Sequence, residues 1–288
     1  MTTIRDIWEQ GAQRLRQAGQ ESARRDAQVL LEYVLDVDRV TLYAYPEREV
    51  APEQQTRFLA LIARREQGEP VAYLLGHKEF YGLDFLVDRR VLIPRPETEL
   101  LVEAALETIR ARLAAGQLPI VADIGTGSGI IPITLAVQEP RLPLLYACDI
   151  STEALAVAQE NCLRQHVEQR VRLLQGDLLA PLPEPVDVLT ANLPYVGTEE
   201  ITQLTPDVHA YEPHQALFSG PQGLDLLQRF CYEARQSGKI KPGALLLLEI
   251  GYQQKESIIH LLRDIWPQAR VSSQKDYSGW DRLLQVSV

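Results

Sequence analysis

Apolar residues recur at three- and four-residue spacing through the first part of the chain, up to about Leu75. Because this spacing places side chains on one face of a helix, it predicts a set of amphipathic helices. Proline is favoured at the first helical position, so Ala51-Pro52-Glu53 is expected to open one of them. We interpret this segment as a small helical bundle, and we find no catalytic constellation in it. The helical positions are Ile4, Trp8, Ala12 and Leu15; Ala27, Leu30, Leu31, Val34 and Leu35; and Phe58, Leu61 and Ile62.

The hydrophobic period changes between residues 79 and 93, where short apolar runs replace the helical spacing. Residues 80–87 and 91–93 flank the charged stretch Asp88-Arg89-Arg90. Two apolar runs on either side of a short polar stretch are typical of a β-hairpin. The sequence therefore predicts a β-hairpin linker here.

A segment with two prolines follows the linker. Pro94-Arg95-Pro96-Glu97 is expected to be extended, because each proline ring fixes its own φ angle. Thr98 is then expected to cap a helix that runs to about Ala115. On its own, the segment is equally compatible with a plain helix start.

From residue 120 onward, short apolar runs alternate with helical patterns such as 154–164 and 224–235. This alternation predicts the α/β class, with a doubly wound parallel sheet whose ligands lie at the carboxyl ends of the strands. The last two runs are expected to form a hairpin-like pair. The predicted strands are Ile120–Ile124, Leu144–Cys148, Val171–Leu174, Val186–Thr190, Ala244–Ile250, and a pair near Ala269–Ser272 and Leu283–Val286.

The first of these strands contains Asp123, two residues before the first of three alternating glycines at 125, 127 and 129. A strand, a glycine turn and a helix N-terminus bring backbone close to a nucleotide-like ligand. A dinucleotide fingerprint would need glycine where Ile130 stands. The segment Asp123-Ile124-Gly125-Thr126-Gly127-Ser128-Gly129 instead resembles motif I of S-adenosylmethionine-dependent methyltransferases. A lone glycine cluster would more simply be a turn without a ligand.

Two further acids follow the next two strands. Asp149 lies 20 residues beyond Gly129, near the spacing at which an acid reaches the ribose hydroxyls of a nucleoside. Its alternative role is the N-cap of the next helix, which Ser151 is equally suited to take. In Gly176-Asp177-Leu178, Asp177 is suited to accept from an adenine amine while the Leu178 backbone faces the ring.

The fourth strand is followed by Asn192-Leu193-Pro194-Tyr195, which resembles the (N/D)-P-P-(Y/F/W) motif of methyltransferases that alkylate planar amide or amino nitrogens. Such a nitrogen is a poor nucleophile while its lone pair is delocalised. Two acceptors, the Asn192 side-chain oxygen and the Leu193 carbonyl, would hold its two N–H groups and turn the lone pair toward the methyl donor. Tyr195 would offer a ring face to the planar group.

Leu193 is a departure from this motif, which has proline at that position. The expected contact comes from the backbone carbonyl, which leucine also supplies, so the chemistry is retained. Pro194 alone then restricts the loop through a fixed φ angle. An Asx-turn leaving a strand is the alternative for Asn-Leu-Pro taken in isolation.

Composition limits the classes of partner. The net charge of −10 disfavours nucleic acid as the main partner, because phosphate contacts require a basic surface. No signal peptide and no membrane span is evident, so we expect a cytoplasmic protein. The three cysteines have no metal-type spacing, and we expect reduced thiols and no metal site.

Three longer segments make the resemblance specific to the HemK/PrmC family, which methylates the glutamine of the Gly-Gly-Gln motif in class I peptide chain release factors. They are Glu69 to Gly76, Glu79 to Leu83 and Leu92 to Glu99. The family pattern continues in Tyr211 to Leu217 and in Leu247 to Gly251, so it covers nearly the whole chain.

The resemblance implies a Rossmann-like class I methyltransferase fold with a seven-stranded mixed sheet. The implied domains are a release-factor-docking helical bundle (1–76), a hairpin linker (77–93) and a catalytic domain (94–288). S-adenosyl-L-methionine, converted to S-adenosyl-L-homocysteine, is the implied cofactor. Glu212 is given a supporting role in holding the active-site loop. The implied cofactor residues are Asp123, Gly125, Thr126, Gly127, Ser128, Gly129, Asp149, Asp177, Leu178 and Asn192, and the implied catalytic and substrate residues are Asn192, Leu193, Pro194 and Tyr195.

Three alternatives remain open. A related enzyme methylates a glutamine of a ribosomal protein with the same motif, and only the N-terminal segment separates it from the main interpretation. A nucleic-acid adenine methyltransferase would use the motif on an exocyclic amine, but would need a basic surface. A noncatalytic release-factor-binding protein would leave the cofactor residues unexplained.

Overall fold

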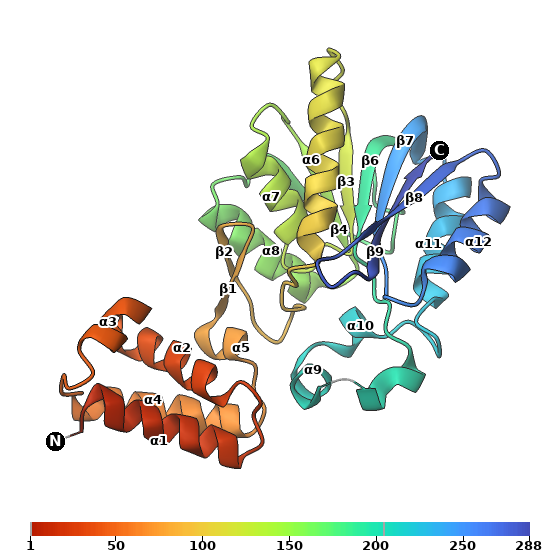
Figure 1. The fold of residues 1–288 in the computed structure, drawn as a ribbon. Helices are drawn as coiled ribbons and strands as arrows, with labels where there is room; N and C mark the ends of the chain where they lie inside the picture. The colour runs from red at the N-terminus through yellow and green to blue at the C-terminus, as the bar shows by residue number, and fades with distance from the viewer. Residues whose placement is uncertain (1, 204) are drawn as a thin grey trace. The chain divides into compact units, whose positions relative to one another are not determined.

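The computed structural model describes residues 2–203 and 205–288 (Figure 1). Packing divides the chain into two compact units. The first unit is Met1–His77 with Thr205–Tyr211, and the second is Lys78–Leu204 with Glu212–Val288. The helices of the first unit are α1 (Ile4–Gln17), α2 (Ala23–Leu35), α3 (Arg39–Ala44), α4 (Pro52–Glu66), α5 (Val71–Leu75) and α9 (Pro206–Tyr211).

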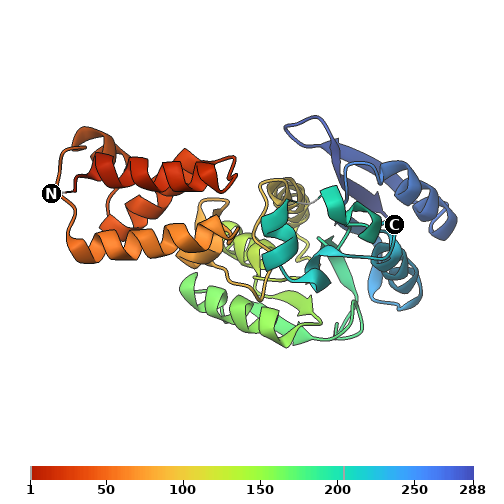
Figure 2. The same cartoon turned by 90° about the horizontal axis from the view of Figure 1, so that it is seen from below.

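Helices α1, α2 and α4 of the first unit lie side by side, as two views show (Figure 1, Figure 2). The predicted helical positions are confirmed, and their apolar faces meet around the fully buried Phe58. Thr3 and Asp6 form a capping box at the start of α1, and Pro52 stands in the first turn of α4. Helices α3 and α5 were not predicted, because six and five residues are too few for a periodic pattern.

A buried ion pair joins two helices of this bundle. Arg65 Nε of α4 donates to Asp26 Oδ2 of α2 at 2.8 Å, and both side chains are at most 10% exposed. The Ser22 hydroxyl donates to the second oxygen of Asp26. The pair therefore depends on both partners, since either charge alone would be costly to bury.

The linker is a β-hairpin, but its strands differ from the predicted ones. Strand β1 (His77–Phe80) and strand β2 (Leu83–Leu86) are joined at Tyr81 and Gly82, with φ angles of 53° and 75°. Two consecutive positive φ angles are the requirement of a type I′ hairpin turn, which glycine meets easily. Asp88-Arg89-Arg90 does form a turn, in which Val91 N donates to the Asp88 carbonyl at 3.1 Å. The prediction that this turn joins the two hairpin strands is wrong, because residues 87–93 form no strand.

The second unit is built on a seven-stranded mixed sheet of order β5-β4-β3-β6-β7-β9-β8. All seven strands fall where the apolar runs predicted them. The first five in this order are parallel, while β9 is antiparallel to both β7 and β8, which confirms the fold class. The strands are β3 (Val121–Ile124), β4 (Leu145–Asp149), β5 (Val171–Gln175), β6 (Val186–Ala191), β7 (Ile240–Glu249), β8 (Arg270–Lys275) and β9 (Asp281–Ser287).

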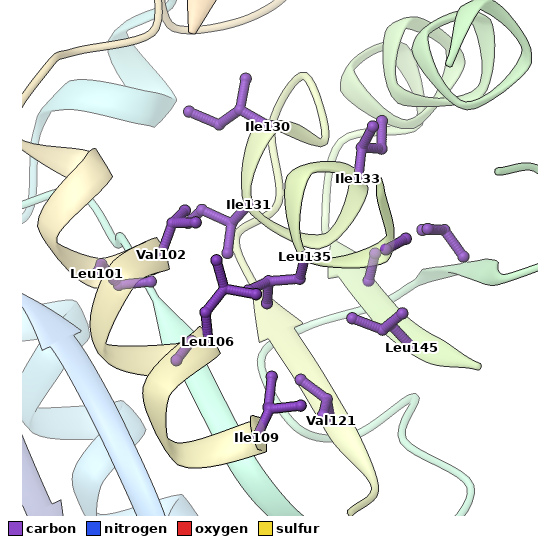
Figure 3. Close-up of a cluster of buried hydrophobic side chains, with 14 of the residues drawn as sticks. Leu101, Val102, Leu106, Ile109, Val121, Ile130, Ile131, Ile133, Leu135 and Leu145 are labelled. Atoms are coloured by element: carbon purple, nitrogen blue, oxygen red, sulfur yellow. The ribbon is translucent and has the colours of Figure 1, made fainter. Parts of the chain in front are cut away.

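Helices cover both faces of the sheet (Figure 1). Successive strand residues point to opposite faces, so Val121 joins the core under one set of helices and Ala122 joins the other. In the first core, Leu106 and Ile109 of α6 lie near Val121 of β3 (Figure 3). One face carries α6 (Thr98–Ala114), α7 (Ile130–Gln138) and α8 (Thr152–Arg164), and the other carries α11 (Asp225–Gln236) and α12 (Lys255–Ile265); η1 (Thr198–Gln203) and α10 (His214–Leu217) lie between β6 and α11 in the chain.

Strand order reverses between β3 and β6, because β4 and β5 lie on one side of β3 and β6 and β7 lie on the other. Ile124 pairs with Ala191 at the ends of these two strands. The glycine turn after β3 and Asn192 after β6 therefore start side by side. Ligands of open α/β sheets bind at such a switch point, beyond the carboxyl ends of the strands.

We expect Asp26→Ala to lower the free energy of unfolding of the helical unit by about 3 kcal/mol, because Arg65 would be left buried without its carboxylate. The double variant Asp26→Leu/Arg65→Met should recover most of this loss, since it buries no charge. Denaturant titration measures the change, and hydrogen exchange of the α2 and α4 amides localises it. An equal loss from Glu47→Ala, at the exposed Arg5–Glu47 pair, would contradict the assignment.

Candidate active site

A cavity of about 510 Å³ lies where β3 and β6 end. This volume is in the range of small-molecule sites in enzymes. Its walls come from the turns after β3, β4, β5 and β6, from the segment 90–98, and from residues between 213 and 229. This cavity therefore lies at the sheet edge where the strand order reverses.

The glycine turn forms one wall of this cavity. Gly125, Gly127 and Gly129 have φ angles of 75°, 55° and 82°, a backbone region that residues other than glycine rarely adopt. A Cβ atom on Gly127 would meet nothing within 4 Å, so its open side faces free space. On Gly129 a Cβ would lie 2.8 Å from Ile133 Cδ1 and 3.3 Å from Ala158 Cβ. Gly129 thus permits close helix packing, whereas Gly125, Thr126, Gly127 and Ser128 line the cavity.

Asp149 ties this turn to the end of β4. Its Oδ2 accepts from Gly127 N at 2.8 Å and its Oδ1 accepts from Ser151 N at 2.9 Å. Burial raises the pKa of Asp149, and these backbone hydrogen bonds oppose the rise. The N-cap role falls to Ser151, whose hydroxyl accepts from Ala154 N, whereas Asp149 is part of the cavity lining.

Asp123 lies beneath the turn and is not part of the cavity lining. Its Oδ1 accepts from the Thr190 hydroxyl at 2.6 Å across the β3–β6 pair. Burial raises the pKa of Asp123 to about 6, although the hydrogen bond from Thr190 opposes this. Asp123 does not line the cavity, so it could affect a ligand only by holding the glycine turn in place. Its cofactor role remains a prediction.

Asp177 and Leu178 line the cavity beyond β5. Leu178 has a φ angle of 45°, an unusual value for a leucine, which is set by the turn it occupies. Asp177 Oδ1 accepts from Arg229 Nη2 of α11 at 2.5 Å, and Arg229 also lines the cavity. Sequence reasoning missed Arg229, since nothing in the helical pattern of α11 marks it.

Asn192, Leu193 and Pro194 line the same cavity as the glycine turn. The Leu193 side chain lies against Gly125, where a Cβ would be 3.0 Å from Leu193 Cδ2. Leucine at the family's proline position thus packs directly on the turn. Tyr195 is not part of the lining; its hydroxyl lies 3.5 Å from Glu249 Oε1, and its carbonyl accepts from Gln254 Nε2 at 2.8 Å.

Thr98 and Glu249 lie behind this loop. The predicted N-cap role of Thr98 is wrong, because Glu97 is the N-cap and the buried Thr98 hydroxyl accepts from Asn192 Nδ2 at 3.2 Å. Burial raises the pKa of Glu249 to about 7; the neighbouring Thr98 hydroxyl and the charge of Arg282 lower it, and the charge of Glu97 raises it. Sequence reasoning gave Glu249 no role, although it ends an apolar strand as Asp149 does.

Glu212 holds the segment that forms the opposite wall. Its almost fully buried carboxylate accepts from Ile93 N at 3.1 Å and from Arg95 Nη2. Arg95 and Pro94 line the cavity. Glu212 therefore makes loop-holding contacts of the kind that the family resemblance implied.

Neither a metal site nor a membrane span is found in the part of the chain that the structure describes. No group of three or more His, Cys, Asp or Glu among residues 2–203 and 205–288 could hold a metal ion. In the same residues, no helix is long and apolar enough to cross a membrane.

Comparison with known proteins identifies the family. Residues 6–76 match the model of the PrmC N-terminal domain, and residues 98–210 match that of the methyltransferase small domain. A protein of Moorella thermoacetica named release factor glutamine methyltransferase is 43% identical over 283 residues, which cover 98% of this chain and 97% of the relative. A protein of Koribacter versatilis with the same name is 41% identical over 272 residues, 93% of each chain.

A solved structure shows the same fold. The hMettl16 catalytic domain in complex with a MAT2A 3′UTR hairpin is 14% identical, with a TM-score of 0.56 over 82% of this chain and 81% of that one. At this identity the likeness concerns the fold alone. The relatives, in contrast, match in sequence over nearly their whole length, and the chain belongs to the family of release factor glutamine methyltransferases.

Proposed function

We propose that this protein transfers a methyl group from S-adenosyl-L-methionine to the side-chain amide nitrogen of the glutamine in the Gly-Gly-Gln motif of class I peptide chain release factors. The observation that carries the proposal is one shared cavity. Asn192, Leu193 and Pro194 line it together with the glycine turn and Asp149. The names of relatives at 41% and 43% identity support the substrate.

The residues around the cavity fit S-adenosylmethionine, which supplies an activated methyl group on a positively charged sulfur. The turn from Gly125 to Ser128 offers backbone without side-chain obstruction at Gly127. Asp149 is proposed to bind the ribose hydroxyls, and Asp177 with the Leu178 backbone is proposed to bind the adenine. The carboxyl groups at this sheet edge favour a cationic ligand.

The substrate amide is proposed to bind at the loop after β6. The Asn192 side-chain oxygen and the Leu193 carbonyl accept its two N–H groups, and this holds the nitrogen with its lone pair free to attack. Such positioning needs no strong base, because the proton can leave after the methyl has transferred. Tyr195 is proposed to offer its ring to the planar amide once substrate is bound.

The partner is proposed to be the release factor itself, bound through its Gly-Gly-Gln loop, with no nucleic acid or membrane involved. Residues 1–76 and the hairpin linker 77–93 are proposed to dock it, and 94–288 to carry out the transfer in the cytoplasm. The test is methyl transfer to purified release factor, followed by peptide mass analysis. One added methyl, lost when the Gly-Gly-Gln glutamine is alanine, supports the proposal. Transfer only to a ribosomal-protein glutamine would overturn it.

Asn192→Ala is expected to lower kcat about 100-fold or more, because one of the two acceptors that position the amide is removed. The dissociation constant of S-adenosylmethionine should change by less than about threefold, since most cofactor contacts remain. Radiolabel transfer gives kcat and calorimetry gives the dissociation constant. Gln117→Ala, which removes an exposed side-chain amide, is the control. A rate equal to that of the wild type would refute the two-acceptor model.

Asp149→Ala is expected to weaken S-adenosylmethionine binding about tenfold or more, because it removes the ribose acceptor and the hydrogen bond that holds Gly127. Glu153→Ala is the matched control: it removes an exposed acid four residues away that does not line the cavity. Calorimetric titration compares the two variants. Equal affinities in both would show that Asp149 does not contact the cofactor.

A further inference from the structure

A chain of three side chains lies behind the candidate amide site. Asn192 Nδ2 donates to Thr98 Oγ1 at 3.2 Å. The Thr98 hydroxyl lies close enough to the Glu249 carboxyl to lower its pKa, and Glu249 Oε2 is buried without a hydrogen-bond partner among the described residues. Thr98 is 0% exposed and Glu249 is 3% exposed, so bulk water does not compete for these groups. The orientation of Asn192 is therefore decided inside the protein.

The direction of this chain follows from counting protons. Thr98 has a single hydroxyl hydrogen; if its oxygen accepts from Asn192, the hydrogen is available to Glu249. Burial raises the pKa of Glu249 to about 7, so above that pH the carboxyl is mainly ionised. In this form Glu249 can only accept, and the Thr98 hydrogen is directed toward it. In the opposite arrangement Thr98 would donate to Asn192 Oδ1, and the amide would be turned by half a rotation.

Such a turned amide would present its N–H groups to the cavity. The glutamine amide nitrogen of the substrate also carries hydrogens, so donor would face donor. We propose, on the basis of the proposed function, that Thr98 and Glu249 are positioning residues that keep the side-chain oxygen of Asn192 directed at the substrate amide.

The sheet register places Glu249 for this role. Ala191 pairs with Leu248, so Asn192 and Glu249 each come next after a paired residue on neighbouring strands. The end of β7 also supports the far end of the loop, since the Tyr195 hydroxyl is 3.5 Å from Glu249 Oε1. Gln254 donates to the Tyr195 carbonyl at 2.8 Å and accepts from Gly251 N at 2.9 Å. The loop from Asn192 to Tyr195 is thus held from one strand end.

Thr98→Val tests the proposal, because valine has the shape of threonine without the hydroxyl. We expect kcat to fall about 10-fold to 100-fold, with KM for release factor and cofactor affinity within about threefold of wild type. Thr98→Ser keeps the hydroxyl and should return kcat to within about threefold. Glu249→Leu, which removes the acceptor, should behave like Thr98→Val.

A double variant separates positioning from a general structural role. If Thr98 acts only through Asn192, then Thr98→Val/Asn192→Ala should be no slower than Asn192→Ala alone. A further loss in the double variant, or wild-type kcat in Thr98→Val, would overturn the proposal. An inactive wild-type enzyme would instead contradict the proposed function, so the two failures are distinguishable.

Stability is checked with Glu249→Gln, which keeps the size of the side chain. Burial raises the pKa of Glu249 to about 7, so above that pH the wild type buries a charge that glutamine lacks. The variant is therefore expected to unfold at pH 8 no earlier than the wild type. Its Oε1 can still accept from Thr98, so kcat should fall less than in Glu249→Leu. A larger loss of kcat in Glu249→Gln than in Glu249→Leu, with both variants folded, would contradict the proposal.

Discussion

The pairing of β3 with β6 is the constraint on which the site depends. Strand order reverses between them, and their last paired residues are Ile124 and Ala191. The glycine turn and the loop from Asn192 to Tyr195 both begin at the next residue. The two strands are buried in the middle of the sheet. The separation between the starts of the turn and the loop is therefore fixed by the hydrophobic core on both faces and not by the loops themselves.

Three buried acids lie at or near the carboxyl ends of the strands and make different contacts. Asp149 and Glu249 end β4 and β7, Asp123 is the last but one residue of β3, and burial raises the pKa of each carboxyl group. Asp149 lines the cavity, Asp123 accepts from Thr190 on the neighbouring strand, and Glu249 lies 3.5 Å from the Tyr195 hydroxyl. Ligands of open α/β sheets bind beyond the carboxyl ends of the strands, and these three acids lie at that edge of the sheet.

Much of this could be predicted from the sequence, since the seven apolar runs and the residues that follow them are local signals. What was missed depends on contacts distant in the chain. Threonine at the start of a helix predicts an N-cap, but Thr98 instead contacts Asn192, 94 residues away. The hairpin turn was predicted at the charged stretch 88–90, but it lies at Tyr81 and Gly82, which have positive φ angles. In the sequence this turn is marked by one glycine only. Arg229 reaches Asp177 only when α11 is packed on the sheet.

The most direct test of this account is a crystal structure of the protein with S-adenosylhomocysteine and a release factor. We predict that the amide nitrogen of the Gly-Gly-Gln glutamine lies about 3 Å from both Asn192 Oδ1 and the Leu193 carbonyl oxygen. In that structure Asn192 Nδ2 should still donate to Thr98. A glutamine amide bound away from the loop after β6, or an Asn192 that presents its nitrogen to the substrate, would contradict the account.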